Sequence, residues 1–153
     1  MHFNRLFTID NISPYEQFEY ELRNSELRNS DGTIVFHMDN IEVPKHWSQL
    51  ATDILAQKYF RKAGIPLKNN DGTFITDENG NKKYGSENSV KQVVHRLAES
   101  WKICGMKYNY FTTPKDAEIF YDEIVYMLLN QMCAPNSPQW FNTGLYHVYG
   151  IEG

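Results

Sequence analysis

The sequence contains few cysteines and no long apolar run, and each absence excludes a class of protein. Cysteine occurs only at Cys104 and Cys133 among 153 residues, too rarely for the disulfide framework of a small secreted domain. Because each lies in an apolar helical pattern, we expect buried, reduced thiols. No apolar segment approaches the roughly 20 residues that span a bilayer, and no apolar h-region of a secretory signal follows residues 1–5. We therefore expect a cytoplasmic protein with no membrane partner.

An excess of basic charge is also missing. The net charge is −4, with 15 Lys and Arg against 19 Asp and Glu, and the two signs are interspersed. A nucleic-acid-binding domain concentrates Lys and Arg on one face, so we expect no nucleic-acid partner. Aromatic residues, in contrast, are abundant: three Trp, nine Phe and ten Tyr, within 41% hydrophobic residues. This length and composition predict one domain, residues 1–153, around a hydrophobic core.

Apolar periodicity predicts a mainly α fold with a small N-terminal β-hairpin. Residues 17–43 alternate polar and apolar side chains on either side of the turn Asn29-Ser30-Asp31-Gly32, a pattern typical of a hairpin. Helical spacing then recurs in three segments, residues 46–62, 87–104 and 113–133.

Capping and breaking residues predict where these helices begin and end. Gly64, with the proline two residues later, would end the first helix, and Gly105 would end the second. Thr113 offers a capping hydroxyl to the third helix and is followed by a proline and, two residues later, an acid. Residues 65–88 are polar and glycine-containing, so we expect a long surface loop with a small hairpin around residues 73–76.

The segment of residues 134–145 is the strongest functional candidate. It combines two prolines, two amides, a hydroxyl and two large aromatic side chains. Proline disfavours the α region for the residue before it, so we expect a loop in which Pro138 holds Ser137 extended. Such a loop can bind a small anion through hydroxyl and backbone N–H groups. It can equally be a well-packed connection, in which Ser137 caps a short turn before Trp140.

Three motifs, in one consistent order, resemble adenosylcobalamin-dependent, or class II, ribonucleotide reductases. The motifs are Glu42-Val43-Pro44-Lys45-His46-Trp47-Ser48-Gln49-Leu50-Ala51-Thr52 with Gln57-Lys58-Tyr59-Phe60-Arg61, then Asn136-Ser137-Pro138-Gln139-Trp140-Phe141-Asn142-Thr143-Gly144, and finally Tyr149-Gly150-Ile151-Glu152-Gly153. The resemblance covers most of residues 14–153, and three motifs in register argue against chance similarity.

The resemblance implies an enzyme that reduces the ribose 2′-hydroxyl of ribonucleotides with a thiyl radical. Homolysis of the cobalt–carbon bond of adenosylcobalamin generates that radical, and a ten-stranded α/β barrel carries the radical and reducing cysteines. This chain resembles the helical N-terminal domain ahead of the barrel, so the barrel is its expected C-terminal partner. Cys104 and Cys133 lie upstream of the reducing position and receive no catalytic role. We therefore expect no catalytic residue, metal site or bound cofactor in this chain alone, and an inactive isolated chain.

One site residue carries over from the resemblance. Ser137 matches the hydroxyl residue that, in the wider family, helps to bind the substrate nucleotide near its phosphates. Asn136 and Pro138 would support it within the substrate-side loop. The resemblance is closer to the diphosphate enzymes, so a ribonucleoside diphosphate is the expected substrate. We also expect an exposed apolar patch where the barrel docks, with Trp47 and Trp140 as its main contributors.

Several alternatives stay open at this point. The chain could be one part of a split reductase, or a helical packing module that only binds a partner chain. Class I reductases contain a related proline-bearing segment, although Trp47-Ser48-Gln49 and Trp140-Phe141-Asn142 favour class II. The cluster of Lys58, Arg61 and Lys62 is interpreted as a solvated helix face rather than a nucleotide site.

Overall fold

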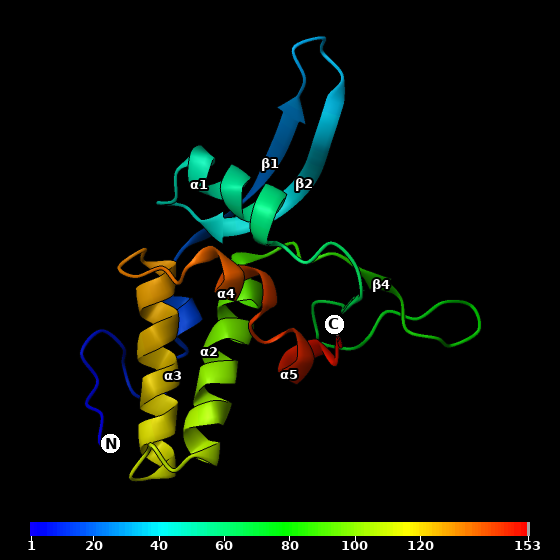
Figure 1. The fold of residues 1–153 in the computed structure, drawn as a ribbon. Coiled ribbons are helices and arrows are strands. Elements are labelled where there is room, and N and C mark those ends of the chain that lie inside the picture. The colour runs from blue at the N-terminus through cyan, green and yellow to red at the C-terminus, as the bar shows by residue number, and fades with distance from the viewer. Residues whose placement is uncertain (153) are drawn as a thin grey trace.

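The computed structural model describes residues 1–152, and Figure 1 shows a helical body from which a β-hairpin projects. The elements are, in chain order, η1 (Pro14–Gln17), β1 (Tyr20–Arg28), β2 (Ile34–Pro44), α1 (Gln49–Ile54), η2 (Leu55–Tyr59), β3 (Ile65–Pro66), β4 (Tyr84–Gly85), α2 (Val90–Lys107), α3 (Pro114–Leu129), α4 (Ser137–Asn142) and α5 (Leu145–Tyr149). Here η1 is a 3-10 turn and η2 a π-helical turn. The predicted class, mainly α with a small N-terminal hairpin, is confirmed.

The hairpin follows the predicted pattern. Strands β1 and β2 pair antiparallel from Tyr20 opposite Pro44 to Arg28 opposite Ile34. The turn between them has Gly32 at φ 86°, a left-handed conformation that glycine adopts without steric cost. At the base of the hairpin Ile41 and Val43 are fully buried, so this end is anchored in the core while the tip extends into solvent (Figure 1).

Helices α2 and α3 lie side by side and form the centre of the body (Figure 1). Helix α2 presents an apolar stripe to α3, to the base of the hairpin and to α1 with η2. The buried hydrophobic residues form one cluster: Ile41, Val43, Trp47, Leu55, Ala56, Phe60, Val90, Val93, Val94, Leu97, Ala98, Val125, Leu128, Leu129 and Trp140. Because β2, η2, α2, α3 and α4 all contribute residues to it, the cluster holds the segment after α3 against the rest of the body.

The first helix is shorter than the predicted segment of residues 46–62. Helical hydrogen bonding runs only through α1 and η2. The helix begins after Ser48, because the Ser48 hydroxyl accepts a first-turn N–H at 3.0 Å and so caps the start. At the other end, the prediction that Gly64 stops the helix is wrong. The chain becomes extended directly after Tyr59, and the Tyr59 carbonyl accepts a hydrogen bond from the buried Arg96 instead of continuing the helix.

The second helix passes through its predicted stop. Helix α2 begins after a capping box of Ser89 and Gln92 and continues to Lys107. Gly105 lies inside the helix. A Cβ at this position would lie 2.5 Å from the Phe111 ring, so the packing of that ring requires glycine. The glycine therefore permits close packing and does not end the helix.

The third helix starts as predicted and ends early. Thr113 and Asp116 form the capping box of α3, whereas the helix stops at Leu129, four residues before the predicted end. Its last carbonyl accepts a hydrogen bond from the Trp47 indole N–H at 2.8 Å, and Gln131 adopts a positive φ of 56°. The indole satisfies a carbonyl that would otherwise lack a partner at the helix end, and the positive φ of Gln131 turns the chain out of the helical path, so the helix ends here.

The predicted long loop contains regular structure. Strands β3 and β4 pair antiparallel, and isolated bridges join Lys68 to Phe74 and Thr76 to Lys82. The small hairpin expected around residues 73–76 is thus part of a three-segment meander that projects from the body (Figure 1).

The prediction of buried thiols is wrong. Cys104 and Cys133 are both exposed and free. Cys104 lies on the solvent side of the last turns of α2, and Cys133 follows the end of α3, where no helix face remains to bury it. Among residues 1–152, no helix has the length and apolar character needed to cross a bilayer.

Candidate functional site

The segment that carries Ser137 is partly helical. Ser137 begins the short helix α4, and Pro138 lies in its first turn, so the predicted extended loop of residues 134–145 with an extended Ser137 is wrong. Asn136 is the extended residue (φ −69°, ψ 162°) and occupies the N-cap position, without a side-chain bond. Proline is tolerated here because first-turn N–H groups have no helical partner. Ser137 is therefore not the cap of this turn.

Ser137 contacts a tyrosine that is distant in sequence. Its exposed hydroxyl lies 2.9 Å from the hydroxyl of Tyr59, at the end of η2. The Tyr59 ring stacks on Trp140 at a centroid distance of 5.5 Å and contacts Phe141 at 5.2 Å. Two segments that are 78 residues apart are thus joined by one hydrogen bond and an aromatic cluster, which fixes where the Ser137 hydroxyl lies.

Arg96 of α2 holds the two segments together from below. Its side chain is fully buried and donates to three backbone carbonyls, those of Trp140 at 2.7 Å, Thr143 at 3.0 Å and Tyr59 at 3.1 Å. The remaining donors bind Glu87, with Nε 3.0 Å from Oε2. One guanidinium therefore satisfies the last carbonyls of both η2 and α4, for which its planar fork of donors is well suited.

Glu87 completes this buried network. Its fully buried carboxylate also accepts hydrogen bonds from the Arg61 N–H at 2.8 Å and from the Tyr149 hydroxyl at 3.0 Å. These bonds replace the water that a buried carboxylate loses. Burial, with the charge of Glu87 nearby, raises the pKa of Tyr149, which therefore stays a protonated donor. The network links η2, α2 and α5, so the frame beneath Ser137 is rigid.

Gly144 fits closely against the same arginine. It adopts φ 86°, and a Cβ here would lie 2.1 Å from the Arg96 carbonyl oxygen. Only glycine allows the chain to turn between α4 and α5 at this distance.

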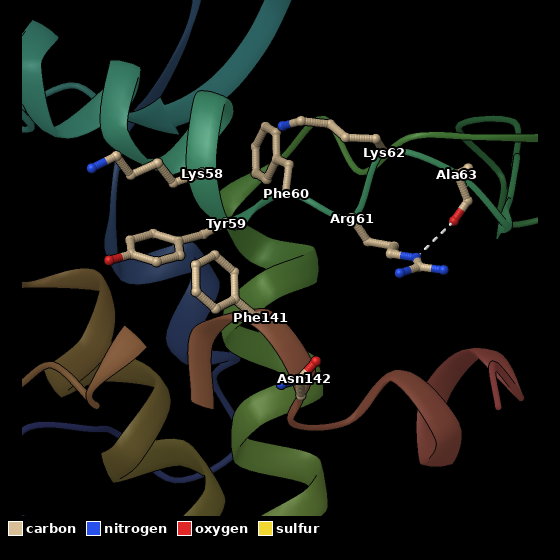
Figure 2. A pocket seen from close by; sticks show the side chains of 8 residues that line it. All are labelled: Lys58, Tyr59, Phe60, Arg61, Lys62, Ala63, Phe141 and Asn142. Carbon is tan, nitrogen blue, oxygen red and sulfur yellow. Dashed lines mark hydrogen bonds between the residues drawn. The ribbon is translucent and has the colours of Figure 1, made fainter. Parts of the chain in front are cut away.

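A hollow of about 400 Å³ lies beside this frame, and Figure 2 shows its lining. The lining residues are Lys58, Tyr59, Phe60, Arg61, Lys62, Ala63, Phe141 and Asn142. The three cations extend in different directions: Lys58 lies on the Tyr59 hydroxyl side, Lys62 reaches over the Phe60 ring, and Arg61 bonds the Ala63 carbonyl (Figure 2). They do not converge on a single point, so the hollow is no phosphate cradle of three positive charges.

A second hollow, of about 320 Å³, shares Tyr59 with the first and is mainly apolar. It is lined by Trp47, Ala51, Ile54, Leu55, Tyr59, Gln131, Ala134, Pro135 and Trp140. The expectation that the two tryptophans are the main surface contributors is wrong, since Trp47 is 7% and Trp140 9% exposed. Trp47 instead belongs to the core cluster, and its indole N–H donates to the Leu129 carbonyl at the end of α3. Ile54, which lines the hollow, is 39% exposed, and Leu50, one helical turn earlier on α1, is 68% exposed.

His95, the histidine beside the α2 stripe, has a structural partner. Its Nδ1 lies 2.7 Å from the Tyr121 hydroxyl, which in turn bonds the Tyr15 hydroxyl at 2.9 Å. Burial lowers the pKa of His95 and raises that of Tyr121 to about 12, so this pair joins a neutral imidazole to a protonated phenol. Within residues 1–152, no three His, Cys, Asp or Glu side chains gather as metal ligands do.

Comparison with known proteins identifies the family. Residues 21–131 match the family model of the class II vitamin B12-dependent ribonucleotide reductases. The whole chain aligns with the vitamin B12-dependent ribonucleotide reductases of Bradyrhizobium diazoefficiens and Agrobacterium fabrum, at 47% and 46% identity. The enzyme of Rhodopirellula baltica is 38% identical over 94% of the chain. The chain belongs to this family.

The chain is short beside these class II reductases. It spans 12–14% of the length of the three relatives named above. Most of each relative's polypeptide therefore has no counterpart in these residues. The frame of Tyr59, Glu87 and Arg96 lies within the matched residues, although the sequence alone predicted no role for any of these three side chains.

Proposed function

We propose that this chain is the helical N-terminal part of a class II ribonucleoside-diphosphate reductase and forms one wall of its substrate site. The assembled enzyme would convert ribonucleotides to deoxyribonucleotides for DNA synthesis in the cytoplasm. The family membership supports the reaction class. The observation that carries the wall assignment is the exposed Ser137 hydroxyl, fixed by Tyr59 above a buried frame.

The substrate group that Ser137 suits is a phosphate. A phosphate oxygen accepts hydrogen bonds from a hydroxyl, and bonds to a charged group are about twice as strong as neutral ones. Asn136 and Pro138 support Ser137 by setting where α4 begins. Asn136 is the extended N-cap, and Pro138, in the first turn, has no N–H that needs a hydrogen-bond partner. Ser137 therefore meets the substrate without first being ordered, which limits the entropic cost of binding.

The catalytic groups and the cofactor belong elsewhere in the enzyme. Adenosylcobalamin has a corrin ring with nucleotide and adenosyl arms, far larger than the drug-sized ligands that fill pockets of ~300–1,000 Å³. The two hollows beside Tyr59 measure about 400 and 320 Å³, so these residues do not fit the cofactor. Cys104 and Cys133 are exposed and free, and we assign neither a catalytic role. We infer that the isolated chain is inactive.

The apolar hollow beside Tyr59 suits the rest of the reductase polypeptide, the α/β barrel. The exposed Leu50 and Ile54 continue the hollow along α1, and exposed apolar patches mark interaction sites. The relatives place far more polypeptide in the same chain than these residues contain. A barrel docked here would cover the hollow beside the segment that carries Ser137, since Ala134, Pro135 and Trp140 line it.

Steady-state kinetics of Ser137→Ala in the complete reductase tests this function. Losing one hydrogen bond to a charged group costs about 1.5–3 kcal/mol, or roughly a 10- to 150-fold loss in kcat/KM. The loss should appear mainly in KM, because a phosphate is remote from the 2′-carbon and is bound alike in the ground and transition states. Cys133→Ser is the control and should keep both constants. An unaltered KM in Ser137→Ala, or an abolished kcat in Cys133→Ser, would contradict the assignment.

A further inference from the structure

We propose that Tyr59 is the positioning residue of the substrate site: its phenol O–H donates to Ser137 and so directs the serine proton toward the bound phosphate. This inference rests on the function proposed above. It adds a second residue, from a segment 78 positions away in sequence, whose role is to set the direction of the hydrogen bond that Ser137 makes.

The geometry places Tyr59 where it can do this. Its hydroxyl oxygen lies 2.9 Å from the Ser137 oxygen, within the usual range for two hydroxyl groups. Figure 2 shows the Tyr59 side chain reaching out past Phe141 with its hydroxyl at the outer end. Tyr59 also lines both hollows. Its hydroxyl therefore links Ser137 to a residue that the two hollows share.

The direction of the bond follows from the chemistry of the two groups. Each hydroxyl has one proton and can also accept, so only one of the pair can donate to the other. A phenol O–H is a stronger donor than an aliphatic one. If Tyr59 donates, the serine keeps its own proton for the phosphate, which offers only acceptors. The two bonds then run in one direction and polarise each other, which strengthens the second bond.

The ring of Tyr59 is held independently of its hydroxyl. Trp140 stacks on it and Phe141 packs against it, while the Tyr59 backbone carbonyl accepts from the buried Arg96 at 3.1 Å. Phenylalanine at position 59 should therefore occupy the same place. This makes Tyr59→Phe a clean removal of one hydroxyl group.

The test is a double-mutant cycle in the complete reductase. Tyr59→Phe should raise KM for a ribonucleoside diphosphate by roughly 2- to 10-fold, the effect of one neutral hydrogen bond, with kcat unchanged. The double variant Tyr59→Phe/Ser137→Ala should match Ser137→Ala alone, because Tyr59 acts through the serine. Tyr121→Phe is the matched control: it also removes a hydrogen-bonded phenol, but from the α2–α3 face, and should leave KM unchanged.

The outcomes separate this inference from the function on which it rests. If Ser137→Ala raises KM and Tyr59→Phe does not, the positioning role is overturned and the proposed function stands. If the two effects add fully in the double variant, Tyr59 acts independently of Ser137, which also overturns the inference. If Ser137→Ala itself leaves KM unchanged, the proposed function fails. A rise in KM shared by Tyr59→Phe and Tyr121→Phe, with equal losses in Tm, would reduce the effect to general destabilisation and overturn the inference.

Discussion

Removing the Arg96 side chain should loosen the segment that carries Ser137. Arg96→Met keeps the length and the apolar stem of the side chain but deletes the guanidinium. Three backbone carbonyls, those of Tyr59, Trp140 and Thr143, then lose their donor. The fully buried carboxylate of Glu87 loses its charged partner as well. Substitution thus leaves an unpaired charge in the core, which is among the costliest of single changes.

The size of the effect follows from this burial. Breaking a buried ion pair by removing one partner costs about 3–5 kcal/mol. For a protein of this size each 1 kcal/mol shifts Tm by roughly 2–4 °C, so Arg96→Met should lower Tm by about 6–20 °C. The Tm of Arg96→Lys should lie between those of the parent and Arg96→Met, because an ammonium keeps the charge near Glu87 but cannot reach three carbonyls as the planar guanidinium does.

Thermal melts and hydrogen exchange of residues 1–153 measure both consequences. Backbone amides of residues 137–144 should exchange faster in Arg96→Met than in the parent. Lys102→Met is the control, since it breaks the half-buried Lys102–Glu99 ion pair of the same helix, worth about 0.2–1 kcal/mol. The reasoning is refuted if Arg96→Met lowers Tm no more than Lys102→Met, or if exchange in residues 137–144 does not change.

Three further predictions concern the glycine turn, pH and the isolated chain. Gly144→Ala should lower the free energy of unfolding by about 2–5 kcal/mol, from left-handed strain of about 1–2 kcal/mol and overpacking of about 1–3 kcal/mol. Gly150 has φ 69° and open space around it, so Gly150→Ala should show only the cost of the strain. Denaturant melts of both variants measure the difference. Burial lowers the pKa of His95, so on acidification His95 is protonated in the unfolded chain before it is protonated in the folded one. Stability should therefore fall as pH drops below about 6.5. His95→Gln should reduce the change in Tm between pH 7.5 and 5.5. Residues 1–153 alone should reduce no ribonucleotide in the presence of adenosylcobalamin, and turnover by the pure chain would contradict the account.

Local patterns in the sequence predicted those parts of the fold that local interactions decide. The hairpin turn at Asn29–Gly32 and the hydroxyl cap at Thr113 depend on neighbouring residues, and both occur as predicted. Helix ends were predicted less well, because tertiary contacts set them. Gly105 stays helical since its missing side chain admits Phe111, and α3 ends where Trp47 bonds its last carbonyl.

The site also divides into a part that the sequence predicted and a part that tertiary contacts set. Ser137 was found through resemblance, but its partner Tyr59 and the frame beneath it join segments far apart in sequence. One signal was present: Arg96 lies three residues after Val93 on α2, beside the apolar stripe, where an unpaired charge would be costly. A charged residue at such a position predicts a buried partner, yet nothing local identifies that partner as Glu87 or the carbonyls as those of η2 and α4.

The most direct test of the central claim compares two ligands on one variant. Equilibrium binding of a ribonucleoside diphosphate and of the corresponding nucleoside would be measured for the complete reductase and for Ser137→Ala. If Ser137 binds the phosphate, the substitution should weaken diphosphate binding by roughly 10- to 150-fold and leave nucleoside binding unchanged. Equal weakening of both ligands, or of neither, would contradict the assignment of Ser137 to the substrate phosphate.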